Sequence, residues 1–115
     1  MPTRNERVKI PQEQWNLPVG YSTDGGKLVT LNEAVREKTP HLAIPSLSDE
    51  QRANLVAARI EAQPKFKLAM IGAGIVDKER AINEVRARSR VGRTLMEIEQ
   101  RVIQDVLRQA DASAE

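Results

Sequence analysis

The sequence predicts a mainly α fold: a small helical domain of four to five helices with an extended N-terminal arm and a short β-hairpin. Only 3% of the 115 residues are aromatic, so aliphatic side chains must form the core, and these suit helix packing better than a broad β-sandwich. Apolar residues also recur at helical spacing through much of the second half of the chain. This length has room for one domain with its own core.

We expect three regions: an extended arm over residues 1–18, a single helical domain over 19–110 and a disordered tail over 111–115. The arm contains three prolines that oppose helix and central strand, namely Pro2, Pro11 and Pro18. Trp15 is the only tryptophan and has little apolar company in the arm. Either the arm straps over its own core, or Trp15 anchors a partner, because tryptophan is prominent among interface hot spots.

Residues 19–31 predict a small β-hairpin. Asp24, Gly25 and Gly26 separate two short runs of strand-forming residues, and an Asp-Gly pair is a strong turn signal. A phosphate-binding loop is disfavoured because the Walker spacing and its Lys-Ser/Thr ending are missing. Leu17 and Tyr21, on either side of the boundary between arm and hairpin, join Trp15 as candidate partner-contacting residues.

Two segments begin with the spacing of a capping box, in which a Ser or Thr and a Glu or Gln three residues later cap each other's backbone N–H groups. Thr30 and Glu33 predict a short helix that runs to about residue 38. Ser48 and Gln51 predict a longer helix that runs to about residue 62.

We expect a further helix from Pro64 to Gly74, with the proline in its first turn and Gly74 as its C-cap. Gly72 and Gly74 resemble the start of a dinucleotide-binding fingerprint, but Asp77 occupies the third glycine position and no second strand is predicted after it. Gly72 is therefore interpreted as a close-packing site. A DNA-binding helix-turn-helix is disfavoured because Glu79 and Glu84 on its second helix would repel phosphates.

The stretch from Asp77 to Ala110 predicts two charged amphipathic helices hinged at residues 89–92. Asp77 is expected to cap the first of them. Its inner positions are Ala81, Ile82 and Val85. On its outer side, Glu84 and Arg88 have the spacing of an i,i+4 ion pair.

The second of these helices carries a wide apolar stripe. Its members are Val91, Leu95, Met96, Ile98, Val102, Ile103, Val106 and Leu107. At 100° per residue the stripe covers about half the circumference, which is more than one neighbouring helix normally covers. Burial against earlier helices of the chain and pairing with a partner both stay open, and Leu95, Ile98 and Val102 are the candidate partner-contacting residues.

Glu99 projects into the middle of this apolar stripe. A bare carboxylate would be costly there, so we expect a structural ion pair with an arginine. The nearest candidates across the hinge are Arg86, Arg88 and Arg90.

The hinge contains the only dense basic run of the chain. Its four arginines are Arg86, Arg88, Arg90 and Arg93, with no acid between them. The run ends at a helix start, where backbone N–H groups also favour anions. Three interpretations stay open: phosphate or nucleic-acid contact, an acidic patch on a protein partner, or a solvated hinge neutralised by internal glutamates. A pair between Glu99 and one of these arginines would weaken the nucleic-acid interpretation.

Several functions lack the residues they need. The chain has no cysteine, so disulfides and thiolate chemistry are excluded, and we expect a reducing, cytoplasmic compartment. The single histidine, His41, has no metal-ligand spacing around it, and we predict no metal and no cofactor. No nucleophile with a base can be placed, which argues against an enzyme. The sequence contains no run of about 18 consecutive apolar residues, so we predict no membrane partner.

The first functional hypothesis is a non-enzymatic accessory or adaptor subunit. It would bind protein partners, or a second copy, through the N-terminal arm and the C-terminal amphipathic helices. The alternative is a small nucleic-acid-binding regulator that uses the arginine-rich hinge 86–93.

Overall fold

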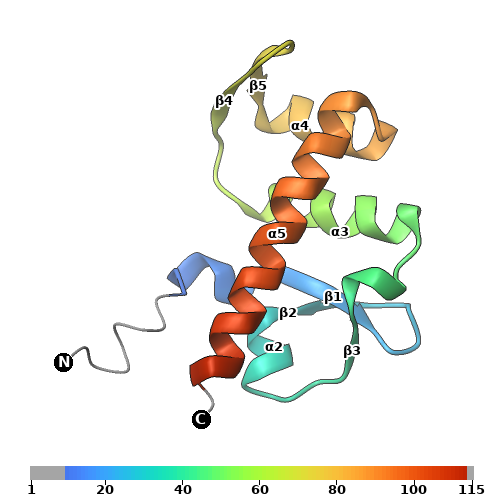
Figure 1. Ribbon diagram of the computed structural model, residues 1–115, viewed down its shortest axis with the longest axis vertical. Helices are drawn as coiled ribbons and strands as arrows, with labels where there is room; N and C mark the ends of the chain where they lie inside the picture. Colours follow the sequence, from blue (N-terminus) through green and yellow to red (C-terminus); the bar gives the residue numbers. More distant parts are fainter. Residues whose placement is uncertain (1–9, 114–115) are drawn as a thin grey trace, which may run out of the picture.

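The computed structural model of the protein describes residues 10–113 (Figure 1). Within this range four α-helices are accompanied by two small antiparallel sheets, so the predicted helical content is confirmed but the fold is mixed α/β rather than purely helical. The elements in chain order are η1 (Gln12–Asn16), β1 (Pro18–Ser22), β2 (Leu28–Thr30), α2 (Leu31–Val35), β3 (His41–Leu42), η2 (Ile44–Ser46), α3 (Asp49–Ala62), β4 (Lys67–Met70), β5 (Gly74–Asp77), α4 (Lys78–Ala87) and α5 (Arg90–Ser113). The two η elements are 3-10 helices.

The first sheet has the strand order β2-β1-β3, with both neighbours antiparallel to β1. The predicted hairpin is confirmed as β1 and β2. Its turn is held by the Asp24 carboxylate, which accepts hydrogen bonds from Ser22 Oγ and from the Gly26 N–H, and by Gly25 in a left-handed conformation (φ 77°). The third strand, β3, was not predicted.

Both capping boxes are confirmed. Thr30 Oγ1 accepts from the Glu33 N–H at 3.2 Å while Glu33 Oε1 accepts from the Thr30 N–H at 2.9 Å. Ser48 and Gln51 make the same exchange at the start of α3. The first helix is shorter than predicted, because α2 ends at Val35.

The helix predicted from Pro64 to Gly74 is wrong. Most of that segment, together with residues 75–77, forms a second hairpin, in which Leu68 pairs with Val76 and Met70 with Gly74. Gly72 and Gly74 both have positive φ (82° and 71°) and make the turn, so Gly74 does not cap a helix. A Cβ on Gly72 would meet nothing within 4 Å, so it is not a close-packing site. A helix-turn-helix arrangement is therefore not formed either, because its first helix is absent from residues 64–74.

The predicted corner between the last two helices is confirmed. Asp77 caps α4 by accepting from the Arg80 N–H at 2.8 Å. Arg88 ends α4 in a left-handed conformation (φ 53°), and Ser89 Oγ then accepts from the Gly92 N–H at 3.0 Å. Helix α5 continues to Ser113, so the disordered tail predicted over 111–115 is wrong for 111–113, and residues 114–115 lie outside the described range.

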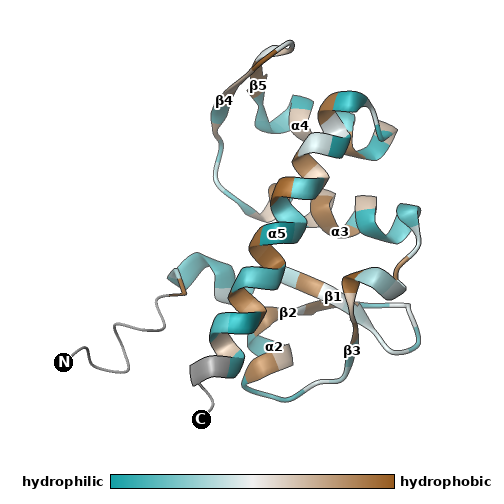
Figure 2. Cartoon of the chain, in the orientation of Figure 1, coloured by the Kyte–Doolittle hydropathy of each residue, from teal (hydrophilic) through white to brown (hydrophobic). Residues whose placement is uncertain are grey.

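The core has two parts, both of which use α3 and α5. One lies between these helices, α4 and β5, with Val76, Ala81 and Val85 buried. The other lies between the first sheet, α2, α3 and the distal half of α5. Helix α5 alternates polar and apolar colours along its length, whereas the β4–β5 hairpin is largely apolar (Figure 2). Among residues 10–113 no helix is both long and apolar enough to cross a membrane.

Candidate nucleic-acid interface

The partner of Glu99 is Arg59 on α3, and none of the hinge arginines. Arg59 Nε lies 2.9 Å from Glu99 Oε1, with the arginine side chain fully buried and the glutamate side chain 17% exposed. Burial lowers the pKa of the Arg59 guanidinium, and the Glu99 carboxylate opposes that effect. The charge of Glu99 is therefore balanced far from the hinge.

The hinge arginines are left largely unpaired. Arg86 lies 3.7 Å from Glu61, and both of these side chains are more than half exposed. Arg88, Arg90 and Arg93 are exposed and form no ion pair with any described residue. Their charge is available to an external anion.

The acid nearest to the hinge is engaged elsewhere. Glu84 was expected to pair with Arg88, but it accepts hydrogen bonds from Ser89 Oγ and from Arg80 Nε instead. The Ser89 hydrogen bond, followed by the contact with Arg80, lowers the pKa of Glu84. The pairing with Arg88 fails because Arg88 leaves the helical conformation at the corner.

These arginines belong to a larger basic region, which we name the hairpin end and define as residues 65–94. It comprises the β4–β5 hairpin, α4 and the first turn of α5, which lie together at one end of the molecule (Figure 1). The hairpin end contains eight Lys and Arg against three Asp and Glu, a formal charge of +5. The other described residues contain seven against eleven, a formal charge of −4. The small net charge of the chain therefore conceals a basic hairpin end. Two acids of the remaining chain lie next to it: Glu61 beside Arg86, and Asp49 in a cleft with Arg88 and Arg93.

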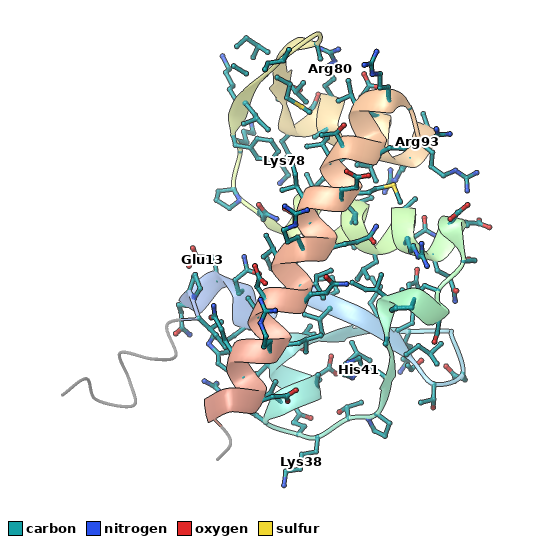
Figure 3. The ribbon with its side chains drawn as sticks, in the orientation of Figure 1. Glu13, Lys38, His41, Lys78, Arg80 and Arg93 are labelled. Atoms are coloured by element: carbon teal, nitrogen blue, oxygen red, sulfur yellow. The ribbon has the colours of Figure 1, made fainter. Side chains whose placement is uncertain are left out.

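Figure 3 shows Lys78, Arg80 and Arg93 on different sides of the hairpin end. Lys78 and Arg80 also have structural contacts: Lys78 Nζ donates to the Gln63 carbonyl at 2.7 Å, and Arg80 Nη1 donates to the Ala73 and Ile75 carbonyls. Lys65 and Lys67, at the base of the hairpin, are exposed and form no ion pair within the described chain. Five of the eight cations are thus free of ion pairs and of structural contacts among the described residues.

Two clefts flank the hairpin. One, of about 580 Å³, lies at its base and is lined by three lysines, two acids and two apolar residues, namely Lys65, Lys67, Lys78, Asp77, Glu79, Phe66 and Ile82. The other, of about 470 Å³, separates the hairpin tip from the start of α5, where Arg90, Val91 and Thr94 form its far wall. The hairpin tip and Arg90 therefore border the same cleft, whereas Arg88 and Arg93 line a separate cleft with Asp49.

The candidate partner-contacting residues have separate fates. Leu17, Tyr21 and Leu95 are buried in the chain's own core. Trp15 is half-buried against that core, with the Arg36 guanidinium 4.2 Å above its ring, so this part of the arm is a strap. Ile98 is 47% exposed on α5, and Val102 is half-buried beside it.

Three exposed apolar side chains were missed by the sequence reasoning because they lie on the unpredicted hairpin. They are Leu68 (40%), Ile71 (107%) and Ile75 (60%). The signal that could have found them is the uncharged run from residue 68 to 76, broken by two glycines, since glycine inside a strand pattern marks a turn.

No family model, curated protein or solved structure matches this chain. Among the described residues no group of three or more His, Cys, Asp or Glu side chains could hold a metal ion.

Proposed function

We propose that the protein is a nucleic-acid-binding protein that engages duplex DNA with its hairpin end. The observation that carries the proposal is a set of three exposed hinge arginines, Arg88, Arg90 and Arg93, inside a region of formal charge +5. None of the three forms an ion pair with a residue of the range 10–113. Phosphate contacts by Lys and Arg supply most of the affinity of such proteins for DNA. A pair with Glu99 would have argued against this function, and Glu99 pairs with Arg59.

Duplex DNA is favoured over single strands for a chemical reason. Binding to single strands relies on aromatic side chains that stack on exposed bases. Phe66 is the only aromatic residue of the hairpin end and is half-buried, while Trp15 and Tyr21 belong to the other part of the core. A duplex needs no such platform and accepts a two-stranded β-ribbon in a groove.

The test is fluorescence anisotropy with a labelled 20-base-pair duplex, repeated over a series of salt concentrations. Four or five phosphate contacts predict that log K falls with log[salt] with a slope of about −4. Replacing Arg88, Arg90 and Arg93 by Gln should reduce the magnitude of the slope by about three and weaken binding at least about tenfold at moderate salt.

The matched control neutralises three exposed cations outside the hairpin end, Lys27, Lys38 and Arg101, and changes the net charge by the same amount. It should bind almost as well as the wild type. Salt-insensitive binding, or equal losses in the two triple variants, would contradict the proposal.

A second candidate is an accessory or adaptor subunit with a protein partner on the outer face of α5. It is favoured by Ile98, which remains 47% exposed beside a shallow groove of about 260 Å³ whose floor includes Val102. Size-exclusion chromatography of the purified chain and co-purification from its native cells test this candidate. Substitution Ile98→Ser should remove the partner or the oligomer, whereas Ile71→Ser on the distant hairpin should not.

A further inference from the structure

The tip of the β4–β5 hairpin presents one large side chain on a slender support. Residues 68–76 contain no side chain that can donate or accept a conventional hydrogen bond. Around the turn, Gly72, Ala73 and Gly74 carry no side-chain atom beyond Cβ. Ile71, at 107% exposure, stands alone at the end of the hairpin.

The hairpin is braced from behind. Val76 is fully buried in the core. Its cross-strand partner Leu68 lies on the same face of the β4–β5 hairpin. From α4, Arg80 Nη1 donates to the Ala73 carbonyl at 2.8 Å and to the Ile75 carbonyl at 3.1 Å. These bonds fix the returning strand against α4, so the tip is held in a projecting position.

Cations lie at two places near this apolar tip. Arg90 lies across the cleft from residues 69–73, and Lys65 and Lys67 stand at the base of the hairpin. An apolar projection with cations on its flank and at its base matches a partner whose outer surface is anionic and whose interior is apolar. The base stack of duplex DNA, enclosed by phosphates, has this arrangement.

We propose that Ile71 inserts between base pairs from the minor groove and bends the duplex, while the nearby cations contact the flanking phosphates. This inference rests on the proposed function. Proteins that bind the minor groove frequently use Ile, Leu or Met as such a wedge and bend DNA by roughly 20–90°. A second copy of the chain is a poorer occupant, because a two-fold contact through this tip would bring two ends of formal charge +5 together.

The experiment measures bending and affinity separately. A 30-base-pair duplex with a central TA step, which unstacks easily, carries a fluorescence donor and an acceptor at its two ends. Wild-type protein should raise energy transfer, because bending shortens the end-to-end distance. Ile71→Ser should abolish that rise and weaken binding several-fold while keeping the salt slope, and Ile71→Leu should restore the bend.

Ile75→Ser is the matched control, because Ile75 is an exposed isoleucine on the strand and not at the tip. It should bend DNA as the wild type does. Salt-dependent binding without bending, or bending that survives in Ile71→Ser, would overturn the wedge and leave the proposed function standing. Absence of DNA binding would overturn both the wedge and the proposed function. If the protein instead binds vesicles of phosphatidylcholine with phosphatidylglycerol, the tip would be assigned to anionic lipid.

Discussion

The guanidinium group of Arg59 connects α3, which carries it, to three other elements. Nε donates to Glu99 on α5 at 2.9 Å, Nη1 to the Pro18 carbonyl of β1 at 2.8 Å, and Nη2 to Gln14 Oε1 of η1 at 2.8 Å. The Arg59 side chain that donates these hydrogen bonds has no solvent exposure. Because three acceptors depend on one buried residue, its loss leaves each of them without that donor.

Substitution Arg59→Met should lower the free energy of unfolding by about 3 kcal/mol, since removing one partner of a buried pair leaves an uncompensated charge. Urea denaturation followed by circular dichroism measures this. Glu99→Gln should lower the free energy of unfolding by less, because the amide oxygen can still accept a hydrogen bond from Arg59. The control is Arg101→Met, an exposed arginine on α5, and a loss in the control equal to that in Arg59→Met would contradict the role assigned to the pair.

Glu84 makes the stability of the hinge depend on pH. The hydrogen bond from Ser89 and the contact with Arg80 hold the pKa of Glu84 below its ordinary value of 4.5. A carboxyl group with a lowered folded pKa stabilises the fold above its ordinary pKa, and this contribution disappears as the pH falls through the lower folded value. Acid should therefore loosen the corner between α4 and α5.

Glu84→Gln should flatten the dependence of melting temperature on pH below 4.5, because the amide does not titrate. Thermal melts followed by circular dichroism over this acidic range measure the slope. Glu79→Gln removes a carboxylate from the same helix, one without a hydrogen-bond partner among residues 10–113. If that control flattens the slope as much as Glu84→Gln does, the explanation is wrong.

At the scale of elements, local signals were predicted well and nonlocal ones were not. The two capping boxes and the Asp-Gly turn could be identified because each is complete within a few residues. The β4–β5 hairpin was predicted to be a helix because Pro64 and Gly74 were interpreted as its start and end signals. What decides its structure is the pairing of Leu68 with Val76 and the burial of Val76 against α3 and α4, which no short window contains.

The candidate site shows the same division. The need of Glu99 for an arginine follows from its position in an apolar stripe. The identity of that arginine depends on the packing of α3 against α5, which brings together residues 40 positions apart. Because of that packing Glu99 does not neutralise a hinge arginine, which could not be predicted from the sequence of the hinge itself.

The corner between α4 and α5 depends on a close approach of the two helices. A Cβ on Gly92 would lie 2.0 Å from the Glu84 carbonyl oxygen and 2.9 Å from the Val85 Cα. Both are backbone atoms, so a side chain cannot move aside to make room. Gly92→Ala should therefore destabilise the fold by about 3 kcal/mol, at the upper end of the range for overpacking.

Chemical denaturation measures the effect, and Gly26→Ala is the control. Gly26 has ordinary φ, and an added Cβ would meet only the Asp24 carboxylate at 3.4 Å or more. Its free energy of unfolding should change by less than about 0.5 kcal/mol. Full stability of Gly92→Ala would show that the two helices are farther apart than described.

At the scale of the whole molecule, charge separation matters more than net charge. The formal net charge is only +2, yet the hairpin end carries +5 and the other described residues −4. The longest axis of the molecule is 43 Å, several times the Debye length of about 8 Å at physiological ionic strength. A polyanion at the hairpin end is therefore screened from acidic side chains that lie more than a Debye length away.

Two pairs of substitutions separate the effect of local charge at the hairpin end from that of net charge in the salt-titrated duplex assay. Arg90→Gln with Arg93→Gln lowers the net charge to zero, and Glu13→Gln with Glu37→Gln raises it to +4. If the local surface governs binding, the arginine pair should reduce the magnitude of the salt slope by about 1.8, because each lost phosphate contact contributes about 0.9. The glutamate pair should leave the slope unchanged, since the number of contacted phosphates is the same. Slopes that follow net charge in both variants would show that binding is nonspecific attraction to the whole protein and not docking by the hairpin end.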